Sequence, residues 1–162
     1  METIHTRHAV WEKVLFRSGI FGAYLVGILG AALETPWVGA AYAVAAVALL
    51  RVVFTRFCSH CPYPCKHGDC LMAPFSLVKR ITGERTGPMK PWERWTFPVV
   101  MIGLIPLFPQ PWLWKRPALL ILFWVLLLGT ALMFRFHMCN ACLFSDCPLN
   151  VTGNHRKWLG VL

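Results

Sequence analysis

The chain has 162 residues, of which 57% are hydrophobic, and its net charge is +9. A soluble domain of this size disperses its apolar residues with a helical or strand period, whereas here they form uncharged runs of nearly bilayer-spanning length. The composition therefore excludes an ordinary soluble protein. It predicts an all-α polytopic membrane protein, a bundle of four transmembrane helices that forms a single membrane domain over residues 1–162.

Four apolar runs are expected to span the membrane, at residues 18–33, 36–54, 95–114 and 117–135. At a rise of about 1.5 Å per residue, the shorter runs can cross the hydrocarbon layer with little tilt. Clustered prolines in the third run predict a kinked or shortened helix there. The short connection Glu34-Thr35 predicts an antiparallel hairpin of the first two helices. We expect the N-terminus to be retained, because no small-residue cleavage site precedes the second run.

The basic residues predict the orientation in the membrane. Of the 16 lysines and arginines, 14 lie before the first run, from Arg51 to Arg94, or from Arg135 onward, and two, Lys115 and Arg116, lie in the remaining charged loop. By the positive-inside rule, both termini and the loop 55–94 and tail 136–162 face the cytosol, as in a multi-pass protein of the inner (cytoplasmic) membrane. The positive charge then faces anionic headgroups of the lipid bilayer, so we expect no nucleic-acid partner.

The first helix has a face of small residues. Gly19, Ala23, Gly27 and Ala31 recur every four residues, which allows a neighbouring helix to approach closely. The alanine-rich second helix is the expected neighbour. We interpret this pattern as structural and assign it no chemistry.

The polar residues of the spans exclude some functions. No histidine lies in the interior of a span, which excludes a bis-histidine haem between helices, and the charged residues lie near span ends, where snorkelling suffices for Arg17 and Arg135. A pump or transporter acting alone is therefore not expected. In the central loop, residues 74–81 predict an interfacial helix with Phe75, Leu77, Val78 and Ile81 toward lipid, and the alternative is a docking surface for a soluble partner.

All seven cysteines fall in two segments, and each segment directly follows an even-numbered span. Even-numbered spans of a bundle with a cytosolic N-terminus end at the cytosolic face, so the topology gathers the thiols there, in a small cysteine-rich cytosolic cap on the bundle. We expect these residues to form the functional site. The central loop contains Cys58, Cys61, Cys65 and Cys70, and the tail contains Cys139, Cys142 and Cys147.

Three interpretations of these cysteines compete. Structural disulfides suit oxidising compartments, whereas the predicted side is reducing. A membrane thiol–disulfide redox protein uses Cys-x-x-Cys pairs, and two such pairs are present. Metal binding fits better, because each pair is followed by at least one further cysteine that can coordinate the same ion or cluster.

The sequence does not determine which metal binds or which cysteines share a site. Zinc prefers four ligands in a closed site, and an iron–sulfur cluster also takes four thiolates. One partition joins Cys58, Cys61, Cys139 and Cys142, and leaves the other three cysteines with His67 or His60. Two four-ligand sites need eight ligands and the chain has seven thiols, so the eighth is a histidine, Asp146 or an external ligand.

Cysteine–proline pairs carry a resemblance to a known family. Cys61-Pro62 and Cys147-Pro148, at the ends of the second and fourth spans, make the layout similar to that of membrane-bound polyferredoxins of the NapH/NosR type. The resemblance implies iron–sulfur clusters and a link to quinol oxidation. The spacings here are Cys58-x2-Cys61-Pro62 and Cys142-x4-Cys147-Pro148, whereas the family repeats a cysteine, three residues and Cys-Pro. The family's tandem ferredoxin segment has no counterpart after Cys147 in these 162 residues.

The favoured hypothesis is an integral membrane metal-binding protein, an iron–sulfur electron-transfer or quinone-linked subunit of a larger membrane complex. The seven cysteines would be ligands of one or two iron–sulfur clusters, and His67 is a further candidate ligand. We expect no catalytic residue in this chain, because catalysis would reside in membrane or cytosolic redox protein partners. The alternatives are a structural or assembly protein in which zinc staples the loop to the tail, and a thiol–disulfide redox protein.

Overall fold

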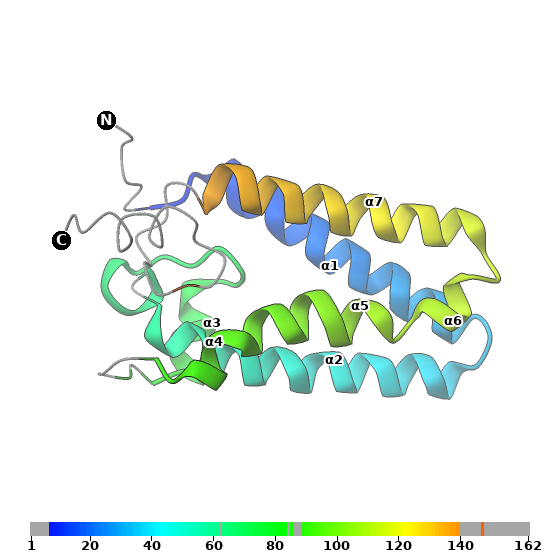
Figure 1. The fold of residues 1–162 in the computed structure, drawn as a ribbon, viewed down its shortest axis with the longest axis horizontal. Helices are drawn as coiled ribbons and strands as arrows, with labels where there is room; N and C mark the ends of the chain where they lie inside the picture. The colour runs from blue at the N-terminus through cyan, green and yellow to red at the C-terminus, as the bar shows by residue number, and fades with distance from the viewer. Residues whose placement is uncertain (1–6, 62, 84, 86–88, 140–146, 148–162) are drawn as a thin grey trace.

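The computed structural model describes residues 7–61, 63–83, 85, 89–139 and 147, without the side chains of residues 65, 66 and 75. Within this part of the chain the secondary structure is helical and contains no strand. Four helical segments are long and apolar enough to cross a membrane (Figure 1). They are Val10–Ala32, Pro36–His60, Pro91–Leu113 and Pro117–Met138. The prediction of an all-α polytopic membrane bundle with four spanning helices is thus confirmed.

The first two spans are regular helices, α1 (Val10–Ala32) and α2 (Pro36–Arg56). They form the expected antiparallel hairpin, and Pro36 begins α2, where its missing N–H is tolerated. α1 begins eight residues earlier than the apolar run at residue 18 predicts (18 − 10 = 8). The extra turns bring Glu12, Lys13 and Arg17 into the helix.

The third span is interrupted, as its prolines predict. It consists of α4 (Pro91–Pro98), the wider π-type segment η3 (Val99–Leu104), α5 (Ile105–Leu107) and α6 (Gln110–Leu113). Proline lacks the N–H of a regular helical hydrogen bond, and a wider turn accommodates that loss. The Gln110 side chain donates a hydrogen bond of 2.8 Å to the carbonyl of Pro106, which satisfies an acceptor in the broken region.

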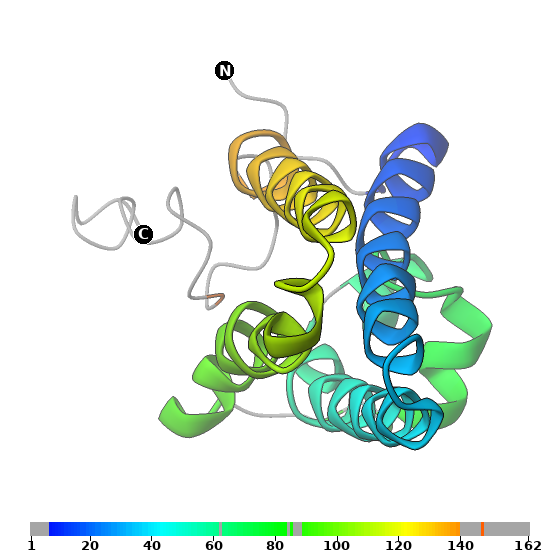
Figure 2. The same cartoon turned by 90° about the vertical axis from the view of Figure 1, so that its right-hand side faces the viewer.

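The fourth span consists of α7 (Pro117–Met133) and the π-type segment η4 (Phe134–Met138). Figure 2, which looks along the bundle, shows the order α1, α2, third span and α7 around it. The small residues of α1 form a buried face, as expected. However, α1 packs most extensively against α7 rather than α2. Gly19 lies against Thr130 of α7, whereas Gly27 lies against Tyr42 of α2.

We call the end of the bundle where α1 begins and α2 and η4 end the cysteine end, and the other end the turn end (Figure 1). At the cysteine end α2 is followed by η1 (Cys58–His60), η2 (Tyr63–His67) and α3 (Phe75–Ile81). Val78 of α3 is fully buried in the core, whereas Leu77 is 47% exposed. The expectation that Val78 faces lipid is therefore wrong, because α3 packs against α2 and η2.

Candidate thiol site at the cysteine end

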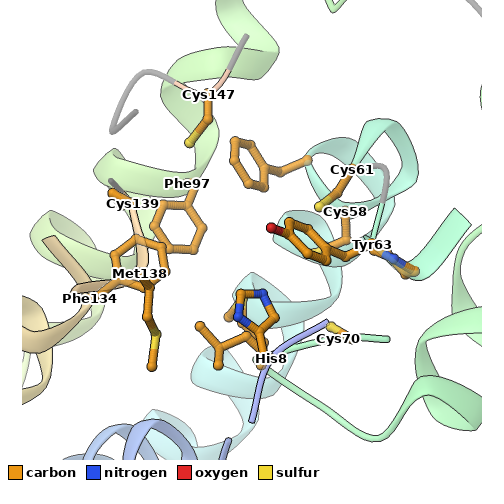
Figure 3. A pocket seen from close by; sticks show the side chains of 14 residues that line it. His8, Cys58, Cys61, Tyr63, Cys70, Phe97, Phe134, Met138, Cys139 and Cys147 are labelled. Atoms are coloured by element: carbon orange, nitrogen blue, oxygen red, sulfur yellow. The ribbon is translucent and has the colours of Figure 1, made fainter. Parts of the chain in front are cut away.

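A cavity of about 80 Å³ lies at the cysteine end, and thiols from both cysteine segments line it (Figure 3). The five cysteines around it are Cys58, Cys61, Cys70, Cys139 and Cys147. Four of them are buried and Cys61 is half-buried. The remaining wall is mostly apolar and includes His8, and Phe97 and Phe134 of the third and fourth spans. The fold therefore brings together thiols that are more than 60 residues apart in the chain, such as Cys70 and Cys139 (139 − 70 = 69).

The other predicted ligands lie elsewhere or outside the described part of the chain. Cys142 and Asp146 lie outside the described residues, and Cys65 lies in η2 but its side chain is not described. His67 does not line the cavity, and its ring centroid is 6.3 Å from that of Tyr63. His60 is likewise absent from the lining, and its Nδ1 lies 3.1 Å from the Arg56 carbonyl oxygen.

The described thiols surround the cavity rather than converge on one point. No three His, Cys, Asp or Glu side chains among the described residues lie close enough together to hold a single metal ion. No disulfide joins any two of the five described cysteines. A mononuclear zinc site needs four ligands about 2.3 Å from one ion, and the described part of the chain does not provide that arrangement.

The start of α1 fastens the loop that carries Cys70. Lys13 Nζ lies 2.6 Å from Asp69 Oδ1. Arg17 donates hydrogen bonds to three loop carbonyls, namely those of Cys70 at 2.8 Å, Leu71 at 3.0 Å and Ala73 at 2.9 Å. The loop backbone therefore has its acceptors satisfied by a cation, which is a strong class of hydrogen bond. The Arg17 side chain thus extends to the loop at the cysteine end of the bundle.

Glu12 connects α1 to the tail segment. Its side chain is 6% exposed, and its Oε1 lies 3.0 Å from Nε2 of His137 in η4. Its Oε2 accepts a hydrogen bond of 2.7 Å from the Ala9 backbone N–H and lies 3.8 Å from Nδ1 of His8. Because His137 lies two residues before Cys139, this contact fixes the tail segment against the same helix that holds the Cys70 loop.

Two groups of the Cys70 loop have shifted pKa values. Burial raises the pKa of the Cys70 thiol, and hydrogen bonds from the backbone of Ala73 and Met72 and the charge of Arg17 oppose the shift only in part. Burial also acts to raise the pKa of Asp69, but the hydrogen bonds from Lys13 and from the His8 backbone outweigh it and hold that pKa below its usual value. The loop thus combines an ionised carboxylate with a thiol that resists ionisation on its own.

Sequence reasoning missed the residues that assemble this site. His8, Glu12 and Lys13 precede the apolar run at residue 18 and carry no motif, and Asp69 was not singled out among the loop residues. The available signal was an earlier start of the first helix: if it begins at Val10, Glu12 and Lys13 lie on its first turn and His8 lies just before it. The charges of Glu12 and Lys13 interrupt the apolar pattern, so hydropathy alone does not extend the helix to Val10.

A larger apolar cavity of about 400 Å³ lies between the third and fourth spans. It exists because α7 contacts the third span mainly through α6, at the turn end. Phe16, Met101, Leu127 and Arg135 line this cavity, which we call the groove, and Phe97 and Phe134 line both the groove and the thiol cavity. The two cavities are thus separated by a shared aromatic wall, in which the Phe97 and Phe134 ring centroids are 6.0 Å apart.

The fold and this site define a four-span membrane protein with thiols gathered at one end of the bundle. No protein-family model matches the chain, and comparisons with curated proteins and with solved structures also gave no match. The resemblance to the NapH/NosR type stays a prediction. The function of the protein is therefore interpreted from the residues of its own chain.

Proposed function

We propose that this protein is an electron-transfer subunit of a larger membrane complex that holds an iron–sulfur centre at the cysteine end. The observation that carries the proposal is that five thiols, from both cysteine segments, line one cavity with aromatic walls. Thiolates are the ligands of iron–sulfur clusters, and low solvent access around a cluster is one of the factors that set its reduction potential. When bound, such a centre supplies one-electron redox chemistry.

The spacing of the thiols favours a cluster over one zinc ion. A cluster contains several iron atoms, so its thiolate ligands stand apart around it, whereas a zinc ion requires its ligands at about 2.3 Å from one point. Thiols that surround a cavity of about 80 Å³ fit the first arrangement better. We assign Cys58, Cys61, Cys70, Cys139 and Cys147 as ligands, and predict that Cys65 and Cys142 complete the set.

The groove between the third and fourth spans suits the quinone-linked form of this proposal. Its lining is mostly apolar, and it shares Phe97 and Phe134 with the thiol cavity. A flat quinone ring stacks well on aromatic side chains, and its isoprenoid tail would follow the apolar part of the groove. The variant Leu128→Trp fills the groove, so it should lower the quinone that co-purifies. Leu122→Trp, at an exposed residue of the same helix that does not line the groove, should not.

We also propose that the cysteine end faces the cytosol. The described cations at this end include Arg17, Arg56 and Arg85, against Lys115 and Arg116 at the turn end. A membrane-impermeant maleimide applied to intact cells should leave the thiols unlabelled and should label them in inverted vesicles after metal removal. Labelling of the metal-depleted protein from outside would reverse the orientation.

Anaerobic purification tests the central proposal. The protein should be brown, contain iron and acid-labile sulfide, lose its visible absorption with dithionite and give a paramagnetic signal when reduced. Cys61→Ser and Cys139→Ser, one from each segment, should each lower the iron content. Ser76→Ala, an exposed change on α3, is the matched control. A colourless protein with stoichiometric zinc would instead support the zinc-stapled assembly protein.

A third outcome concerns the thiol–disulfide alternative. A protein without metal, in which thiols of the folded state react freely with alkylating reagents, would remove both metal proposals. Reversible formation of a disulfide within the Cys58–Cys61 pair would then identify the exchanger. The measurement is mass spectrometry of the alkylated protein with and without prior reduction.

A further inference from the structure

Two arginines meet at one buried carboxylate where α4 begins beside the end of α2 (Figure 1). Glu93 of α4 is 3% exposed, and its Oε1 lies 3.2 Å from Nη1 of Arg85 and 4.0 Å from Nη1 of Arg56. The side chains of Arg56 and Arg85, which we call the arginine pair, are 42% and 48% exposed. The pair thus presents two cations at the surface, held close together by one acid beneath them.

Separate contacts fix each member of the arginine pair. The guanidinium of Arg56 lies over the Trp92 ring, 4.8 Å from its centroid, and this contact orients the flat group against an aromatic face. The backbone N–H of Arg85 donates a hydrogen bond of 3.2 Å to the carbonyl of Ser59, just after α2. Both cations are therefore in place before a ligand arrives, which lowers the entropy cost of binding one.

Most hydrogen-bond donors of the arginine pair are not used by the described part of the chain. Each arginine side chain has five N–H donors. The 4.0 Å contact of Arg56 with Glu93 is too long for a hydrogen bond, and Arg85 donates one hydrogen bond to Glu93 from Nη1. Two guanidinium groups around one carboxylate also leave these three side chains with an excess positive charge. The pair is therefore suited to an additional anion with several acceptor oxygens.

The place of the arginine pair in the bundle indicates which kind of anion this is. Arg56 is the last residue of α2, and the exposed Trp92 lies in the first turn of the third span, where tryptophans mark the membrane interface. Exposed apolar side chains follow toward the middle of both spans, with Val52 one turn from Arg56 and Val99 two turns from Trp92. An anion-binding group above an apolar surface matches a phospholipid, whose acyl chains would lie along the two spans.

We propose that the arginine pair binds the phosphate of an anionic phospholipid at the cysteine-end interface of α2 and α4. The planar guanidinium matches a phosphate group, whose oxygens accept charged hydrogen bonds of about 2.7–2.9 Å. Basic sites between membrane helices bind acidic lipid headgroups in this way. The excess charge of the pair selects against a zwitterionic lipid, because it repels the ammonium group of that lipid. The site is independent of the proposed metal centre, since neither arginine lines the thiol cavity.

Lipid titration of the full-length protein in detergent tests the site, with native mass spectrometry to count bound lipid. The wild type should bind phosphatidylglycerol more tightly than phosphatidylcholine. Arg56→Gln and Arg85→Gln should each weaken the binding of phosphatidylglycerol about tenfold, because a hydrogen bond to a charged group contributes roughly that factor or more. Lys115→Gln removes one cation at the turn end and should bind both lipids as the wild type does.

A triple variant separates lipid binding from folding. Removal of the arginines alone leaves Glu93 buried without its cations, which destabilises the fold. Arg56→Gln combined with Arg85→Gln and Glu93→Gln avoids that charge, so this variant should fold and should not distinguish the two lipids. Equal binding of the two lipids by the wild type, or unchanged selectivity in the triple variant, would overturn the proposal. An equal loss in Lys115→Gln would also overturn it, because the effect would then come from surface charge in general.

Discussion

The two ends of the bundle are held together in different ways. At the turn end, short connections join neighbouring helices, and Glu34 pairs with Lys115 at 2.9 Å on an exposed surface. At the cysteine end, long segments fold over the bundle, and the acidic groups of Glu12, Asp69 and Glu93 are buried there, between 3% and 6% exposed. Each of these buried acids contacts basic side chains, and Glu93 lies 3.2 Å from Arg85.

This difference indicates at which end of the bundle ion pairs are needed to position segments of the chain. A short turn needs no ion pair to close, so an exposed pair there adds little. A buried carboxylate is tolerated only when it is paired, and removal of its partner leaves a costly charge behind. The buried pairs of the cysteine end occur where segments distant in sequence must meet around the thiols. We interpret them as the framework of the site.

The largest effect is expected for Arg17→Leu. The change removes three hydrogen bonds to the carbonyls of Cys70, Leu71 and Ala73. It should lower the free energy of unfolding by about 3 kcal/mol or more, because bonds to a charged donor are strong and the buried acceptors stay unpaired. Unfolding midpoints in an SDS titration of the solubilised protein measure this. Lys115→Leu at the turn end is the control, and an equal loss in both variants would contradict the comparison of the two ends.

A second prediction compares two glycines of α1. A methyl group on Gly19 would meet the Thr130 side chain, which is held by its own hydrogen bond of 2.6 Å to the Leu126 carbonyl. A methyl group on Gly30 would meet the end of the flexible Leu113 side chain. Gly19→Ala should therefore destabilise the bundle by about 1–3 kcal/mol, and Gly30→Ala by less. The same SDS titration measures both, and the reverse order would show that the α1–α7 contact is not the tighter one.

The smallest effect is expected from acid. The pKa of Asp69 is held below its usual value of 3.8, so its contribution is present above that pH and is lost as pH falls through the folded-state value. Asp69→Asn should thus be less stable than the wild type at pH 7, and the difference should shrink as the pH falls below 3.8. Glu34→Gln should show no measurable difference at pH 7 or in acid, because Glu34 is exposed. A difference for Asp69→Asn that persists unchanged in acid would show that the ion pair is not its cause.

The apolar sequence pattern was enough to predict the membrane bundle. The four spans follow from local runs of apolar residues, and the interruption of the third span follows from its prolines. The start of α1 could not be read from hydropathy, because Glu12, Lys13 and Arg17 interrupt the apolar pattern on its first turns. Their partners lie in distant segments, so their burial is a tertiary property.

The sequence by itself determined that seven thiols lie in two segments that follow the second and fourth spans, because the spans and their order are local properties. Only the tertiary structure decided that α1 packs most extensively on α7 and that His8 and Glu12 join the site. These contacts connect residues 8 and 69, and 12 and 137. Pairings over such separations depend on how the helices pack, and no local pattern of residues specifies them.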